Sequence, residues 1–171
     1  MTGKSAAIIC SASFPWKYNE NDPDCVLLKE VLAEQIRALA DEGITEFLSG
    51  MAQGVDIWCA GIVINLRQEN PALKLRCILP CKGQEIKWAA SNQELYYSIL
   101  KRANDVVYVS QEYNRGCMLK RNRYLVEHSS IILAVYNGVR RSGTGATVSY
   151  AQKMGREIIM IDPVTRHITY Q

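Results

Sequence analysis

The stretch that decides the fold is IILAVYNGVRRSGTGATVS, residues 131–149, in which an apolar strand, a Gly-Thr-Gly loop and a helix follow one another directly. A helix N-terminus leaves backbone N–H groups unpaired and carries partial positive charge, so this order of elements favours a bound anion. Two glycines allow the backbone to approach a ligand, and two threonines offer hydroxyl donors. Taken alone, the loop is equally consistent with a turn that needs glycine only for its geometry. The ligand contacts predicted from this loop are Ser142, Gly143, Thr144, Gly145 and Thr147.

A second junction of the same kind lies earlier in the chain, in EFLSGMAQGVD at residues 46–56. Apolar residues recur at helical spacing from Val55 to Leu66, so the turn leads into an amphipathic helix. Ligands of open α/β sheets bind beyond the carboxyl ends of the strands. Two glycine loops that converge on one crevice therefore favour a ligand site over two plain turns. The contacts predicted from this second loop are Ser49, Gly50, Gly54 and Asp56.

The composition is that of one globular domain covering residues 1–171, with 48% hydrophobic residues to build a core. A net charge of +3 permits an anionic ligand but does not indicate the dense basic face that duplex DNA requires. No signal peptide or transmembrane run is found, so we expect a cytoplasmic protein whose six cysteines are reduced thiols, without membrane contact. Cys77 and Cys81 have the wrong spacing for zinc, and no metal or cofactor is expected.

Strand and helix patterns alternate along the whole chain. We expect strands at residues 6–10, 46–49, 73–79, 105–109, 131–136, 157–161 and 166–170, and helices at 25–41, 55–68, 84–102, 116–128 and 144–155. This alternation predicts an α/β fold with a doubly wound, mostly parallel sheet and helices on both faces.

Three stretches carry a resemblance to a known family: SGMAQGVD at 49–56, CMLKRNRYLVEHSSIILAVYNG at 117–138 and SGTGATVSYA at 142–151. Together they resemble the YpsA-like branch of the SLOG superfamily, and the likeness covers nearly the whole chain. The superfamily includes cytokinin-activating phosphoribohydrolases of the LOG type, the DNA-processing protein A family and proposed sensors of nucleotide-derived ligands. The resemblance implies a Rossmann-like fold with a nucleotide-type pocket.

Arg121 completes the predicted site, because it falls where the LOG-type enzymes carry an arginine before their glycine loop. It lies on the border of the buried stripe of its helix, where it either binds phosphate or carboxylate or covers apolar surface with its stem. Those enzymes also carry a glutamate four residues past the loop, and Ser149 stands there in this chain. Serine alone cannot activate water, which weakens the hydrolase interpretation unless Asp56 or Glu112 supplies the carboxylate.

Asp56 has two interpretations. An acid in the first turn of a helix is favourable without any ligand, and a carboxylate at this place can also accept hydrogen bonds from ribose hydroxyls. Because a carboxylate repels a phosphate, we assign the sugar to this loop and the phosphate to residues 143–147.

The resemblance fails after the first strand. YpsA-like proteins carry a TGHR-type motif there, whereas this chain has CSAS at residues 10–13, and the look-alike TGKS at residues 2–5 precedes the strand. SGMAQGVD also resembles the corresponding loop of DNA-processing protein A, a single-strand DNA binder. Aromatic residues that could stack bases are Trp88, Tyr96, Tyr97, Tyr113 and Tyr124.

The sequence therefore predicts a module that binds or senses a nucleotide-derived small molecule, of nucleotide or ADP-ribose type, with no catalytic residue assigned. The alternatives are a nucleotide-processing N-glycosidase or phosphoribohydrolase, and a single-stranded nucleic-acid binder. Assembly into a homo-oligomer is also open.

Overall fold

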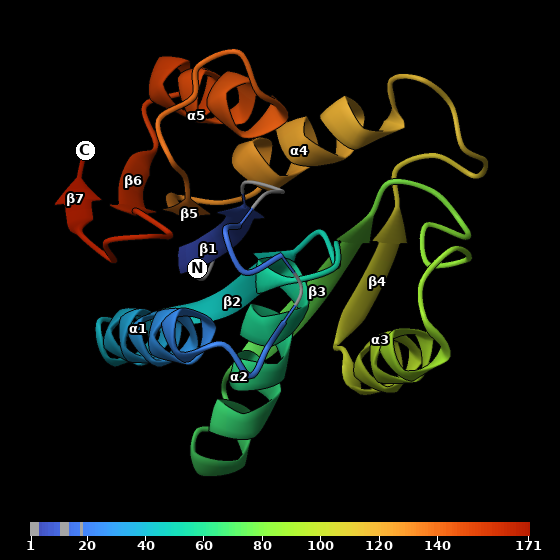
Figure 1. Cartoon of the computed structure of the whole chain (residues 1–171), viewed down its shortest axis with the longest axis horizontal. Coiled ribbons are helices and arrows are strands. Elements are labelled where there is room, and N and C mark those ends of the chain that lie inside the picture. Colours follow the sequence, from blue (N-terminus) through green and yellow to red (C-terminus); the bar gives the residue numbers. More distant parts are fainter. Residues whose placement is uncertain (1–3, 11–13, 18) are drawn as a thin grey trace.

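The protein is described here by a computed structural model covering residues 4–10, 14–17 and 19–171. Strands and helices alternate along the chain (Figure 1). The strands are β1 (Lys4–Cys10), β2 (Ile44–Ser49), β3 (Lys74–Leu79), β4 (Asp105–Tyr108), β5 (Ile131–Val135), β6 (Glu157–Ile161) and β7 (Ile168–Tyr170). The helices are α1 (Pro23–Asp41), α2 (Val55–Glu69), α3 (Ala90–Arg102), α4 (Cys117–Glu127) and α5 (Gly143–Lys153).

The seven strands form one sheet in the order β4-β3-β2-β1-β5-β6-β7. Strands β1 to β6 run parallel, and β7 pairs antiparallel with β6. The chain first moves from β1 outward to β4 and then returns to β5 on the other side of β1. This reversal places the switch point of the topology between β1 and β5, where open α/β sheets bind their ligands. The predicted doubly wound, mostly parallel sheet is confirmed.

Helices cover both faces of the sheet, with α1, α2 and α3 on one face and α4 and α5 on the other (Figure 1). Alternate residues of β1 point to opposite faces. Ala6 and Ile8 therefore enter the core beneath α1 to α3, whereas Ala7 and Ile9 enter the core beneath α4 and α5. All four are buried, which explains why a central strand with two covered faces reads as a continuous apolar run.

The third helix begins later than the sequence predicts. Residues 84–88 were expected to be helical, but turns occupy residues 82–87 and α3 starts at Ala90. Gly83 opens this turn with a φ of +83°, a conformation that favours glycine. The side-chain amide of Gln93 then donates to the carbonyls of Glu85 and Ile86, at 3.0 and 3.1 Å. These contacts satisfy carbonyl groups outside the helix, so the segment is stable without being helical.

Within the described part of the chain, no helix is both long and apolar enough to cross a bilayer. Side chains of histidine, cysteine, aspartate and glutamate form no group of three or more suited to a metal ion among the same residues. Five of the cysteines are buried thiols in the packed layers: Cys25, Cys59, Cys77, Cys81 and Cys117.

Candidate functional site

A pocket of about 300 Å³ lies at the carboxyl edge of the sheet, next to the switch point. Its walls come from the end of β1, the turn after β2, the segment after β3 and one face of α4. The lining residues are Ile8, Ile9, Cys10, Ala52, Gln53, Asp56, Gln84, Trp88, Met118, Arg121, Asn122 and Leu125. Two of the predicted site residues, Asp56 and Arg121, provide its charged side chains. We call it the Asp56–Arg121 pocket.

Arg121 reaches from α4 to the turn after β2. Its side chain is only 7% exposed, although its helical position predicted a border residue. Nη1 donates to the carbonyl of Gly50 at 2.7 Å, and Nε donates to Oδ1 of Asn122 at 2.9 Å. Among the described residues, Nη2 has one hydrogen-bond partner, the sulfur of Met118 at 3.9 Å, which is a weak acceptor. Burial lowers the pKa of Arg121, and the charge of Asp56 opposes that shift.

Gly50 gives this arginine the space that it occupies. A Cβ at residue 50 would lie 2.5 Å from Nη1 of Arg121 and 2.8 Å from its Cζ, so any side chain there would displace the guanidinium group. The sequence predicted Gly50 as a ligand contact. In the structure it provides the space and the carbonyl that hold the guanidinium group.

Asp56 lies in the first turn of α2 and is 5% exposed. Its Oδ2 accepts a hydrogen bond from the backbone N–H of Ala52 at 3.1 Å. Its Oδ1 is buried and has no hydrogen-bond partner among the described residues. Burial raises the pKa of Asp56, and the charge of Arg121 and the Ala52 hydrogen bond act in the opposite direction.

The two charged groups therefore leave hydrogen-bonding capacity unused inside one pocket. A buried acceptor without a partner costs about 1–3 kcal/mol, and such groups are rare in native proteins. Oδ1 of Asp56 can take a donor, and Nη2 of Arg121 can give to a stronger acceptor than sulfur. A ligand that carries a hydroxyl group and an anionic or carbonyl oxygen satisfies both.

The other residues predicted from the glycine loop at residues 46–56 shape its turn. Ser49 is buried, and its hydroxyl donates to the carbonyl of Asp56 at 2.9 Å and accepts from the N–H of Met51 at 3.2 Å. Gly54 precedes α2 with a φ of +100°, which a side chain would strain. The pocket lining thus includes Asp56 and Arg121 but not Ser49, Gly50 or Gly54.

The glycine loop at residues 142–147 uses its side chains for its own structure. Ser142 caps α5, since its Oγ accepts from the N–H of Gly145 at 3.0 Å. Thr147 donates its hydroxyl to the carbonyl of Gly143 at 2.8 Å. Thr144 donates its hydroxyl to the carbonyl of Cys10 at 2.7 Å. A hydroxyl has a single hydrogen, so neither threonine retains the donor that the sequence analysis expected it to offer.

Gly145 packs closely against the segment that precedes α5. A Cβ there would collide with the backbone carbonyl oxygens of Val139, at 2.7 Å, and of Arg140. The glycine therefore permits residues 139–142 to fold against the start of α5. A Cβ on Gly143, in contrast, would meet nothing within 4 Å among the described residues.

The two loops approach the same end of β1, but in the part of the chain that the structure describes no residue of the 142–147 loop lines the Asp56–Arg121 pocket. The bond from Thr144 to Cys10 brings the start of α5 against a residue that lines the Asp56–Arg121 pocket. Thr147 instead lines a separate groove between α4 and α5, together with Ser149. Residues 11–13 of the CSAS segment, and residues 2 and 3 of the TGKS look-alike, lie outside the described residues.

The sequence analysis did not assign Gln84 and Trp88 to this pocket. The amide of Gln84 lies 3.3 Å from the carbonyls of Gly50 and Met51, so it supports the same turn as Arg121. Both residues follow β3, and the rule that ligands bind beyond the carboxyl ends of strands is the signal that could have found them.

Three aromatic residues of the nucleic-acid alternative, Trp88, Tyr96 and Tyr97, form one cluster of near-perpendicular rings, with centroids 5.3 and 5.6 Å apart. Tyr96, at the centre of this cluster, is buried in the core. Tyr124 stacks on His128, with 3.7 Å between the ring centroids. Tyr113 is exposed in the loop before α4.

The sequence model of the family described as YspA SLOG, named YpsA, matches residues 16–165. The chain belongs to this family. It is 34% identical over 122 residues to a UPF0398 protein of Bacillus pumilus strain SAFR-032, covering 70% of this chain and 66% of that relative.

The SPbeta prophage-derived protein YoqJ of Bacillus subtilis strain 168 is 30% identical over 160 residues, which cover 83% of this chain and 91% of YoqJ. The X-ray structure of TM1055, a structural genomics target, has a similar fold, with a TM-score of 0.57 and 17% sequence identity. The match covers 91% of this chain and 72% of the TM1055 chain. This likeness shows the Rossmann-like fold.

Proposed function

We propose that the Asp56–Arg121 pocket binds a nucleotide-derived ligand and that the protein acts as a sensor or regulatory module. The observation that carries the proposal is the buried Oδ1 of Asp56, which lacks a partner in the wall of a pocket that also contains Arg121. Membership of the YpsA SLOG family supports a nucleotide-type ligand, as does the position at the switch point of a Rossmann-like sheet.

The lining matches the parts of a ribonucleotide. A ribose hydroxyl can donate to Oδ1 of Asp56, and an oxygen of the phosphate or base can accept from Arg121. Trp88 supplies an aromatic surface for the base. Small-molecule pockets span about 300–1,000 Å³, so a cavity of about 300 Å³ fits a nucleoside or a mononucleotide portion better than a whole dinucleotide.

A thermal-shift series with ribonucleotides, their 2′-deoxy forms and ADP-ribose tests the proposal. A ligand that binds only the folded chain at a hundredfold excess over its Kd stabilises it by about 2.7 kcal/mol. Each kcal/mol moves the Tm of a domain of this size by roughly 2–4 °C, so we expect a shift of about 5–10 °C. Arg121→Met should remove most of this shift, while Arg102→Met, at the exposed end of α3, should retain it.

Asp56→Asn sharpens the test. If Oδ1 accepts from the ribose, the wild type should prefer the ribonucleotide over its deoxy form and the variant should lose that preference. No shift with any nucleotide would refute the proposal. Salt-sensitive binding of single-stranded DNA in its place would support the nucleic-acid alternative.

Hydrolysis of a nucleotide is a second candidate, and Asp56 is again the residue that favours it. A buried carboxylate with a raised pKa beside a cation has the character of a general base. Ser149, which stands where the LOG-type enzymes carry glutamate, is exposed and lines the groove between α4 and α5 instead. Release of base from nucleoside monophosphates at about 1 per second or faster, abolished by Asp56→Asn, would establish this activity.

A further inference from the structure

The charges in the lining of the Asp56–Arg121 pocket balance each other. Among the described residues, Asp56 and Arg121 are the charged members of the lining, and both are buried. Cys10 also lines the pocket, but burial raises the pKa of its thiol, which therefore stays neutral at pH 7. The lining thus holds one positive and one negative charge, and its net charge is zero.

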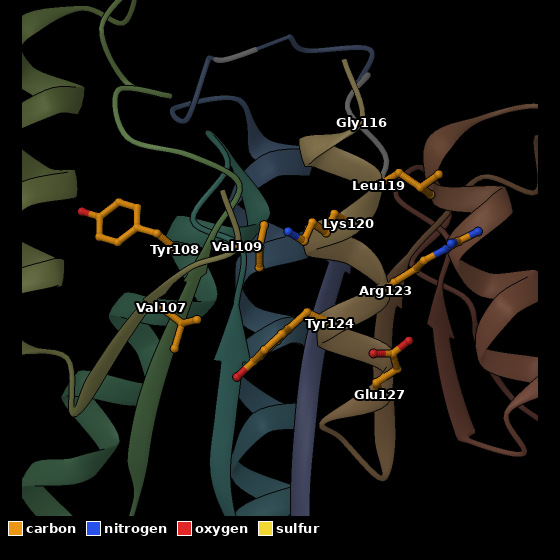
Figure 2. Close-up of a pocket in the computed structure, with 9 residues that line it drawn as sticks. All are labelled: Val107, Tyr108, Val109, Gly116, Leu119, Lys120, Arg123, Tyr124 and Glu127. Carbon is orange, nitrogen blue, oxygen red and sulfur yellow. The ribbon is translucent and has the colours of Figure 1, made fainter. Parts of the chain in front are cut away.

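The exposed cations of α4 belong to a different surface. Lys120 and Arg123 line a groove of about 490 Å³ between α4 and β4 (Figure 2). In the described part of the chain, this groove shares no lining residue with the Asp56–Arg121 pocket. The guanidinium carbon of Arg123 also lies over the ring of Tyr150, 5.6 Å from its centroid. These two cations therefore add no charge to the lining of the pocket.

The guanidinium group of Arg121 is already engaged on both of its hydrogen-bonding edges. A bidentate bond to a phosphate uses two neighbouring nitrogens, either Nε with Nη2 or Nη1 with Nη2. Nε donates its single hydrogen to Asn122, and Nη1 donates to the carbonyl of Gly50. Nη2, which lies beside the sulfur of Met118, is the nitrogen left for a ligand. Arg121 is thus better placed to give one bond to a ligand oxygen or ring nitrogen than to clamp a phosphate.

The N-terminus of α2 also adjoins the pocket, and helix N-termini commonly bind phosphate. Asp56 already places an anion there, because it lies in the first turn and its Oδ2 accepts from the N–H of Ala52 at 3.1 Å. Two anions at one helix end repel each other. A phosphate therefore gains less from this helix than it would without the carboxylate.

Two neutral amides in the lining have orientations that their hydrogen bonds fix. Oδ1 of Asn122 accepts from Nε of Arg121, so its NH₂ group faces the other way. Nε2 of Gln84 lies 3.3 Å from the carbonyl of Gly50, and a carbonyl cannot donate, so the amide oxygen of Gln84 faces away from it. Together with Oδ1 of Asp56, these groups offer a ligand an amide donor and two acceptors. Ribose hydroxyls and the edge of a base present the matching groups.

We infer that this pocket recognises the nucleoside part of its ligand and that 5′-phosphate groups add little to the affinity. The inference rests on the proposed function and narrows its ligand class. A phosphate monoester carries a charge of about −1.5 to −2 at pH 7, whereas the one buried cation is balanced by Asp56. An anion buried without a partner is costly, so the phosphate of a bound nucleotide stays in solvent.

Isothermal titration calorimetry of the wild type tests the inference with the four ribonucleosides and their 5′-mono- and diphosphates. We expect at least one nucleoside to bind, and its phosphorylated forms to bind no more than about fivefold tighter. An excess of inorganic phosphate should not displace the nucleoside. A nucleotide that exceeds this fivefold gain, or displacement by phosphate, would overturn the inference and leave the proposed function standing. If no nucleoside or nucleotide binds, both fail.

The variant Asp56→Asn tests whether charge balance sets this selectivity. With the charge of Arg121 no longer balanced, the monophosphate should gain at least about tenfold in affinity relative to the nucleoside. Asp41→Asn is the matched control, because it removes the same charge from the exposed end of α1, just before β2 begins at the opposite edge of the sheet. It should leave the ratio of the two affinities unchanged. Equal ratios in the two variants would refute the inference, and the wild-type titration decides the matter if Asp56→Asn does not fold.

Discussion

Gly50→Ala provides the most direct test of how the candidate site is held together. The added Cβ would lie 2.5 Å from Nη1, 2.8 Å from Cζ and 2.9 Å from Cδ of Arg121. The guanidinium group must therefore move and lose its 2.7 Å bond to the carbonyl of residue 50. The backbone at Gly50 is outside the left-handed region, so alanine itself causes no strain there.

Two terms set the size of the effect. A hydrogen bond from a charged group contributes about 1.5–3 kcal/mol, and an extra methyl group in a packed site costs about 1–3 kcal/mol. Because the side chain of Arg121 can shift in part, we expect a loss of about 2–4 kcal/mol in the free energy of unfolding. The Tm should fall by roughly 4–16 °C.

Denaturant unfolding of four proteins measures this loss: the wild type, Gly50→Ala, Arg121→Ala and the double variant. With Arg121 truncated, the new Cβ has no guanidinium to displace, so the cost of Gly50→Ala should fall close to zero. Gly61→Ala is the control, because its Cβ would meet nothing within 4 Å and it lies inside α2. That change should stabilise the chain by about 0.5–1 kcal/mol. Equal costs of Gly50→Ala in both backgrounds would refute the role given to Arg121.

Three further predictions concern single groups. Gly145→Ala should lower the free energy of unfolding by about 1–3 kcal/mol, because the new Cβ collides with the carbonyl of Arg140. Gly143→Ala should change it little, and similar losses in the two variants, measured by thermal unfolding, would contradict this packing. Ser142→Ala should cost about 0.5–2 kcal/mol by removing the cap of α5, and an unchanged melt would mean the cap is dispensable. Burial raises the pKa of Asp56, so the folded chain holds this proton more tightly than the unfolded chain and stability declines as pH rises above the ordinary aspartate range. The free energy of unfolding of the wild type minus that of Asp56→Asn should therefore fall as the pH rises above about 4, and an increase would contradict the direction of the shift.

The fold could be predicted because its signals are local. Each strand is a short apolar run, each helix has its own periodicity, and β1 to β6 alternate with the helices along the chain. Segment 84–88 was the exception, because the contacts from Gln93 that keep it in turns depend on side chains and not on hydrophobic spacing.

The candidate site could be predicted only in part. Asp56 and Arg121 were both predicted to contact a ligand, and the structure places both in the lining of one pocket. The burial of Arg121 depends on a carbonyl 71 positions away in the sequence, which helical periodicity does not reveal. The hydroxyl of Thr144 is likewise committed to Cys10, 134 positions away. Roles as ligand contacts stay predictions for all ten residues.

The central position of β1 has a consequence for synthesis of the chain. β1 pairs with β2 on one side and with β5, which begins at Ile131, on the other. A ribosome adds roughly 5–20 residues per second, so about 80 residues between these two partners require on the order of 4–16 s. During that time one edge of an apolar strand has nothing to pair with, and unpaired strand edges promote aggregation. The nascent chain is thus most vulnerable before β5 emerges, when β1 to β4 have all been translated and the middle of the final sheet is still an edge.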